Sequence, residues 1–138
     1  MNKLNVNIAK LATAAMLANG TIEKAELEVC KNLAEDLEVN WVDFEKVIND
    51  EKGLISKLSE EKFDEYIENI AKEISEDDAP FAFEAVTHVL LADGILEEDE
   101  AVVLSVLADA LTLPSSDIIF TLSHKFASTP NFKVQFGE

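Results

Sequence analysis

An internal repeat constrains the fold of this sequence more than any other feature. When residues 17–39 are written over residues 91–113, an offset of 74, nine of 23 positions are identical without a gap. Self-similarity of this kind indicates that one supersecondary unit occurs twice. The identical pairs are Leu17/Leu91, Ala18/Ala92, Gly20/Gly94, Glu23/Glu97, Glu26/Glu100, Val29/Val103, Leu33/Leu107, Ala34/Ala108 and Leu37/Leu111, and Asp43/Asp117 extends the match.

Apolar residues recur at helical spacing through both copies and through the segment between them. With only 4 Gly and 3 Pro, the chain lacks the frequent turn signals of a β-sandwich or β-barrel. The sequence therefore predicts an all-α fold, a compact bundle of about seven helices, with no strand between residues 5 and 125. The expected helices span about 5–18, 23–38 and 41–49 in the first unit, 59–76 in a linker, and 79–92, 97–112 and 115–127 in the second unit.

The length of 138 residues suits a single domain covering 1–138. We expect two repeated three-helix units at about 5–50 and 79–127, joined by the linker helix at about 59–76. The tail, 128–138, alternates Phe132, Val134 and Phe136 with polar residues, which predicts an extended segment that docks or frays.

The charge of the chain limits its partners. It has 28 acidic residues against 11 lysines and no arginine, a net charge of −17. Binding nucleic acid through its phosphates needs clustered basic residues, so nucleic acid is not an expected partner. No stretch approaches the ~20 apolar residues of a membrane span, so direct membrane insertion is not expected. A cation or a basic protein is the natural partner of such a field.

Cysteine usage gives the expected compartment. The single Cys30 excludes an internal disulfide framework and a cysteine-rich zinc site. Nothing in the sequence therefore indicates an oxidising environment, and we expect a cytoplasmic protein.

The acidic residues concentrate at the turn that opens the second helix of the second unit. Five of the eight residues 93–100 are acids, and residues 73–124 hold twelve acids and no lysine. Glu100 lies on the apolar stripe of its helix, and Glu26 occupies the same place in the first unit. A carboxylate on a buried stripe is costly unless it is hydrogen-bonded, paired or metal-bound, so both glutamates need an explanation.

Two explanations remain open. In the first, Glu23 and Glu97 begin their helices, and Glu26 and Glu100 cap them from the third helical position. In the second, the turns hold a divalent cation such as Ca²⁺, Mn²⁺ or Mg²⁺ through oxygen ligands. The candidate ligands are Asp93, Glu97 and Glu100 at the second turn, with Asn19, Glu23 and Glu26 as a weaker copy at the first.

The sequence of the second turn can be compared with the second half of an EF-hand calcium loop. Gly94, Leu96, Glu97 and Glu100 match loop positions 6, 8, 9 and 12, but positions 1 and 3 fall on apolar residues that cannot bind a metal. The sequence therefore predicts few protein ligands, many water ligands and weak affinity.

These turns resemble those of a known family. The segment Leu91-Ala92-Asp93-Gly94 with Glu100, and its copy Leu17-Ala18-Asn19-Gly20 with Glu26, are similar to the TerB-like family associated with tellurite resistance. The resemblance covers about residues 5–127 and implies an all-helical bundle without known catalytic activity. It also implies a link to bacterial metal-stress responses through acidic clusters and protein partners. Asn19 departs from the pattern because it replaces the acid.

We therefore expect a non-enzymatic acidic module that binds a divalent cation and protein partners. With two histidines, one cysteine and no arginine, the chain offers little material for catalysis. The alternative is an acidic decoy, or inhibitor, that presents carboxylates to a basic partner as nucleic-acid mimics do. The inward glutamates favour the first interpretation, because a mimic needs only outward charge.

Overall fold

A computed structural model of the chain describes residues 1–129 and 132–135, apart from the side chain of Asn19. Seven α-helices account for most of it, which confirms the predicted all-α fold. In order they are α1 (Lys3–Met16), α2 (Lys24–Asp36), α3 (Trp41–Ile55), α4 (Glu60–Ala71), α5 (Ala79–Leu90), α6 (Glu98–Ala110) and α7 (Ser115–Ser128). A 3-10 turn, η1 (Leu17–Asn19), follows α1, and two short strands, β1 (Ile95–Glu97) and β2 (Lys133–Gln135), complete the structure.

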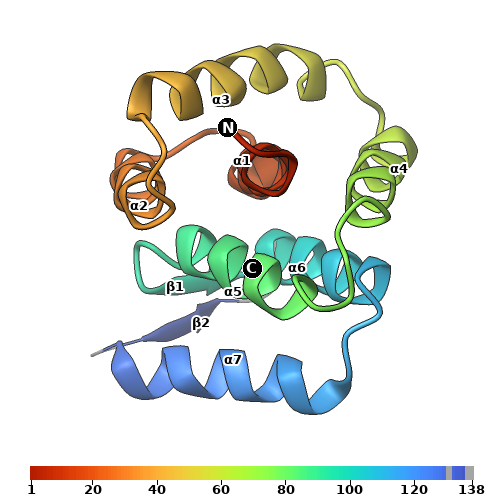
Figure 1. The fold of residues 1–138 in the computed structure, drawn as a ribbon. Helices are drawn as coiled ribbons and strands as arrows, with labels where there is room; N and C mark the ends of the chain where they lie inside the picture. The colour runs from red at the N-terminus through yellow and green to blue at the C-terminus, as the bar shows by residue number, and fades with distance from the viewer. Residues whose placement is uncertain (130–131, 136–138) are drawn as a thin grey trace.

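Helix α1 runs through the middle of the molecule. Figure 1 shows α3 above it, α2 and α4 on its two sides, and α5 with α6 below. It makes contacts with α3, α4, α5 and α6. Helix α7 lies at the bottom of the same view, outside this ring.

The core consists of two clusters that share α1 and α5. One cluster joins these two helices to α4 and α6, and it contains Leu11 and Phe83. The other joins them to α2 and α3, and it contains Ile8 and Phe44. A helix that supplies both clusters must be apolar on more than one face. This explains the long run of small and aliphatic residues in α1.

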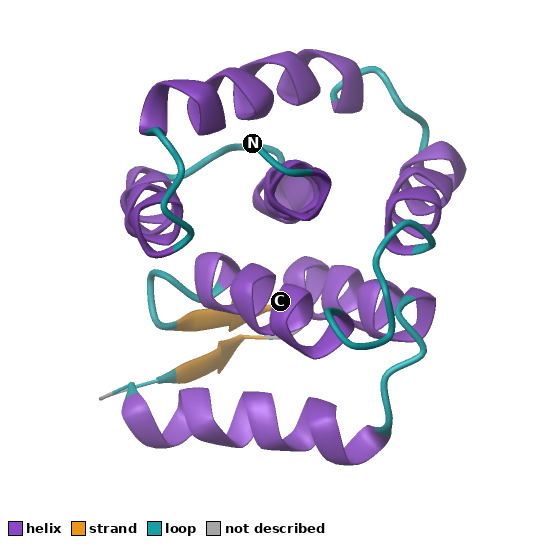
Figure 2. Cartoon of the chain, viewed as in Figure 1, coloured by secondary structure: helices purple, strands orange, loops and turns teal. Residues whose placement is uncertain are grey.

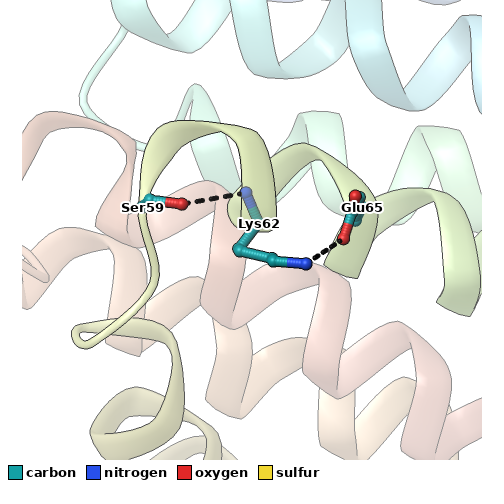
Figure 3. A network of polar contacts seen from close by, with 3 residues as sticks. All are labelled: Ser59, Lys62 and Glu65. Carbon is teal, nitrogen blue, oxygen red and sulfur yellow. Dashed lines mark hydrogen bonds and ion pairs between the residues drawn. The ribbon is translucent and has the colours of Figure 1, made fainter.

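Short polar side chains fix where several helices begin. Asn40 accepts a hydrogen bond from the Val42 amide at 2.9 Å and so caps α3. Ser59 caps α4 in the same way through the amide of Lys62, at 3.3 Å. The Lys62 ammonium then pairs with Glu65 one turn later, at 3.2 Å (Figure 3).

Element boundaries recur with the offset seen in the sequence. Helix α1 ends at Met16 and α5 at Leu90, and α2 and α6 each span 13 residues that begin 74 positions apart. Helices α3 and α7 also begin 74 positions apart. That the two halves superpose stays a prediction.

Three expectations need correction. The short strand β1 lies inside the range where no strand was expected, and it pairs in parallel with β2 in the tail (Figure 2). Helix α3 continues six residues past the predicted end, because Ile55 belongs to the core and is only 4% exposed. The linker helix α4 ends at Ala71, five residues early. Turn hydrogen bonds follow it, and Ile74 packs there against both clusters.

Candidate functional site

The two turns identified from the sequence are built alike. Each reverses direction at a glycine with a positive φ, 94° at Gly20 and 75° at Gly94. The amide of each glycine donates to a carbonyl three residues earlier, that of Leu17 at 2.9 Å and that of Leu91 at 3.0 Å. Glycine suits both positions because this backbone conformation strains residues that carry a Cβ.

A capping box closes each turn. The backbone amide of Glu23 donates to Oε1 of Glu26 at 2.8 Å, and that of Glu97 donates to Oε1 of Glu100 at 2.9 Å. In return, the side chain of the first glutamate of each pair accepts the amide of the second. The capping explanation is therefore confirmed for both units, and it accounts for an acid on an otherwise apolar stripe.

Glu26 and Glu100 are buried, with 2% and 3% of their surfaces exposed. Burial raises the pKa of each carboxyl from 4.5 to about 7, and the capping hydrogen bond opposes the rise. Negative charge nearby raises both pKa values further. For Glu26 this charge comes from Glu100 and Asp93 as well as from its own turn.

This electrostatic coupling shows that the two turns are near each other in space, although they are 74 residues apart in sequence. The contact between η1 and α6 joins them directly. The fold therefore places the second turn close enough for the charges of Glu100 and Asp93 to raise the pKa of Glu26. A repeat in the sequence alone did not establish this proximity.

The remaining candidate residues are closer to solvent. Asp93 is exposed, and its Oδ1 accepts the amide of Ile95 at 3.0 Å. Glu97 is half-buried, and Glu23 is exposed. The side chain of Asn19 lies outside what the structure describes. Among the described residues, no three His, Cys, Asp or Glu side chains converge in an arrangement that could hold a metal ion.

The chain tail adds a basic residue that the sequence analysis missed. Strand β2 pairs with β1, and the Lys133 amide donates to the carbonyl of Gly94 at 3.0 Å. Lys133 thus lies beside the acidic turn that has no lysine nearby in sequence. The alternation of apolar and polar residues in the tail was the available signal, but it did not identify the partner strand.

A cavity of about 510 Å³ lies next to the first turn. Leu17, Ala18 and Gly20 form one wall, and residues at the start of α4 and α6 form others. Three carboxylates line it, from Glu60, Asp64 and Asp99. The first turn therefore opens onto an acidic hollow, whereas the second turn is paired with strand β2 of the tail.

Two other reactive side chains, Cys30 of α2 and His88 of α5, lie outside the two turns. Cys30 is fully buried against Met16, and burial raises the pKa of its thiol to about 12. His88 contacts Lys125 of α7, and burial lowers the pKa of His88. The negative charge of Glu84 opposes this and raises the pKa of His88. No described helix is both long and apolar enough to span a membrane.

Comparison with known proteins gives one result. A family model described as tellurite resistance protein TerB matches residues 5–122. Neither the curated proteins nor the solved structures include a significant match. The family match covers both turns, both capping boxes and nearly all of the helical bundle. The chain therefore belongs to the TerB family.

Proposed function

We propose that this chain is a non-catalytic TerB module of a bacterial stress response of the tellurite-resistance type. It acts in the cytoplasm through protein partners and binds a divalent cation weakly at its second turn. Asp93, Glu97 and Glu100 supply the oxygen ligands, and Asn19, Glu23 and Glu26 form a poorer copy.

The observation that supports this proposal most directly is the coupling of the turns. Burial raises the pKa of both Glu26 and Glu100 to about 7, and the charge of Asp93 raises both further. The charge of Glu100 also raises the pKa of Glu26. Concentrated carboxylates repel one another, and a hard cation relieves that repulsion. The acids of residues 97–100 add to the negative field at this point.

The hydrogen bonds of the turn are compatible with a cation. Asp93, Glu97 and Glu100 each accept one backbone amide. An ionised carboxylate has two oxygens and about four acceptor sites, so each side chain keeps an oxygen for a metal. In this structure the three do not converge, so binding requires side-chain rotation about Asp93 and Glu97. Weak affinity follows, with Kd on the order of 10⁻⁴–10⁻³ M.

The test is a titration of the full chain followed by NMR. With Ca²⁺ or Mg²⁺ we expect amide shifts at residues 92–101 that are larger than those at 18–27, and with Mn²⁺ we expect line broadening at the same places. The double variant Asp93→Asn, Glu97→Gln should abolish these changes while its amide groups keep the backbone hydrogen bonds.

A matched control removes equal charge elsewhere. Glu76→Gln, Asp77→Asn changes two exposed acids between α4 and α5, and it should leave the titration unchanged. If millimolar cation moves neither turn, or moves the first turn more, the cation part of the proposal is wrong. The acids are then caps and solvated surface.

The net charge of −17 favours a second candidate, an acidic decoy for a basic protein. Such a chain would bind a basic polymer such as poly-lysine with an affinity that falls steeply as salt rises. The Asp93→Asn, Glu97→Gln variant and its control would then lose affinity equally, because only total charge matters. A cation site predicts different behaviour for the two variants.

A further inference from the structure

Helix α7 differs from every other helix described, because none of its residues is buried. Its inner stripe contains Ile118 and Leu122, which pack against the core, and Lys125, which contacts His88 on α5. A cavity of about 570 Å³ remains between α7, α5 and α6. The helix is therefore held by one narrow stripe at the edge of the molecule (Figure 1).

The opposite side of α7 is exposed and carries no Asp, Glu or Lys, and His124 stacks on Phe120 at its edge. At 100° per residue, five residues share this side. Ile119 is 63% exposed and Phe120 is 73% exposed, the highest exposed fraction among the large apolar residues described. We call this surface the α7 outer face, and its residues are Ser116, Ile119, Phe120, Ser123 and Ala127. Phe126 lies at its border and packs edge-on against Phe132 of the tail.

The charge distribution makes this face exceptional in the chain. Residues 1–100 hold 25 of the 28 acids and nine of the 11 lysines, a net charge of −16. Residues 101–138 have a net charge of −1. Within α7, Asp117 and Lys125 cancel, and neither belongs to the outer face. An acidic molecule therefore presents one apolar, uncharged helix surface.

We propose that the α7 outer face is the docking surface for a second copy of this chain. Two copies that approached through any strongly acidic face would bring like charges together, whereas this face brings apolar side chains together without charge. A basic partner would be drawn instead to the acidic faces, because the α7 outer face offers no carboxylate. If α7 packs against α7 of the other copy about a twofold axis, both copies contribute the same residues to the interface.

The remaining charge gives this dimer an unusual salt dependence. Each copy carries −17, so the two repel at long range even though the contact itself is uncharged. Salt screens repulsion between exposed charges beyond a Debye length of ~10 Å at 0.1 M. Rising salt should therefore strengthen the dimer, whereas a contact made by pairing acidic and basic residues would weaken.

The experiment is sedimentation velocity of the full chain over a concentration series at about 0.05 M and about 0.5 M salt. We expect a monomer–dimer equilibrium that shifts toward dimer at the higher salt. Phe120→Glu should weaken dimerisation by roughly 30-fold or more, since it places like charges at the centre of the interface. Ser123→Glu, a change at a small exposed residue of the same face, should also weaken it.

Val42→Glu is the matched control. It adds the same charge at an apolar residue of α3 that is 69% exposed, and it should dimerise like the parent chain. Melting temperatures verify that every variant is folded. A parent chain that stays monomeric at both salts overturns the proposal, as does equal weakening by Val42→Glu, or a dimer that dissociates as salt rises.

Discussion

The two turns share what a helix needs in order to begin and differ in what surrounds it. Both have a glycine with positive φ and a buried capping glutamate, 74 residues apart. The second turn lies under strand β2, and a Cβ built on Gly94 would meet Thr129 at 3.6 Å. A Cβ on Gly20 would meet nothing within 4 Å, and this turn borders the 510 Å³ cavity.

The comparison indicates that the features common to both turns, the glycine and the capping box, are the ones that folding requires. A capping box satisfies backbone donors that no helix can satisfy internally, so losing it from either unit would leave buried polar groups without partners. The number of acidic residues near each turn and the presence of a paired strand can differ, because neither is needed to begin the helix. The second turn has more acidic residues and a paired strand, whereas the first turn borders an open hollow.

The largest expected effect comes from removing a cap. At pH 5.5, Glu100→Ala and Glu26→Ala should each lower the free energy of unfolding by about 2 kcal/mol, because each leaves a backbone amide unsatisfied in a buried place. Glu28→Ala, at an exposed position of α2, should change it by no more than about 0.5 kcal/mol. Urea unfolding measures all three. If only one of the two glutamates matters, the equivalence of the turns is wrong.

The next effect is a dependence of stability on pH. Both buried glutamates have a folded pKa of about 7 against 4.5 for an ordinary glutamate. Between these values the folded state holds more protons than the unfolded state, so the free energy of unfolding falls as pH rises from 4.5 through 7. After allowance for relaxation and screening, we expect a loss of about 2 kcal/mol for the pair.

The double variant Glu26→Gln, Glu100→Gln isolates this contribution. Glutamine can still accept the capping amide but cannot ionise, so the variant should be more stable than the parent at pH 8 and show a flatter pH profile. Glu28→Gln, Glu35→Gln removes the same charge from exposed positions of α2 and should keep the slope of the parent. Urea unfolding with a chelator present compares them, and equal slopes in both variants would contradict burial as the cause.

The third prediction tests the asymmetry between the turns. Lys133→Pro removes the amide that donates to Gly94, so strand β2 should detach. We expect a loss of about 1 kcal/mol in the free energy of unfolding. Amide hydrogen exchange should become faster at residues 94–97 and stay unchanged at 20–23. Faster exchange at both turns would mean that the tail supports the whole bundle.

The sequence was enough to predict the fold, because helical spacing and the repeat are local signals. It also contained both capping boxes, which depend on glutamates only three residues apart. It could not reveal that the charge of Glu100 raises the pKa of Glu26, because the distance between these two residues depends on how the two units pack. The β1–β2 pairing was missed for the same reason, since a three-residue strand takes its identity from a partner 38 residues away.

The smallest effect concerns how α2 and α6 end. Two residues beyond the end of each helix lies a residue with positive φ that is not glycine, Glu38 at 59° and Thr112 at 53°. The next amide in each case reaches back five residues, from Val39 to Ala34 at 2.8 Å and from Leu113 to Ala108 at 3.1 Å, which is the Schellman pattern. Glycine usually occupies this position because a Cβ strains it, and a β-branched residue strains it more.

We therefore expect Thr112→Gly to raise the free energy of unfolding by about 1 kcal/mol and Glu38→Gly by about half of that, because glycine also makes the unfolded chain more flexible. Thermal unfolding at pH 7 measures both, with Thr21→Gly, outside any helix, as a control that should not gain stability. Equal gains at both positions would mean that side-chain branching does not matter here. A loss at Thr112 would mean that its hydroxyl, which donates to the Leu111 carbonyl at 2.7 Å, outweighs the backbone strain.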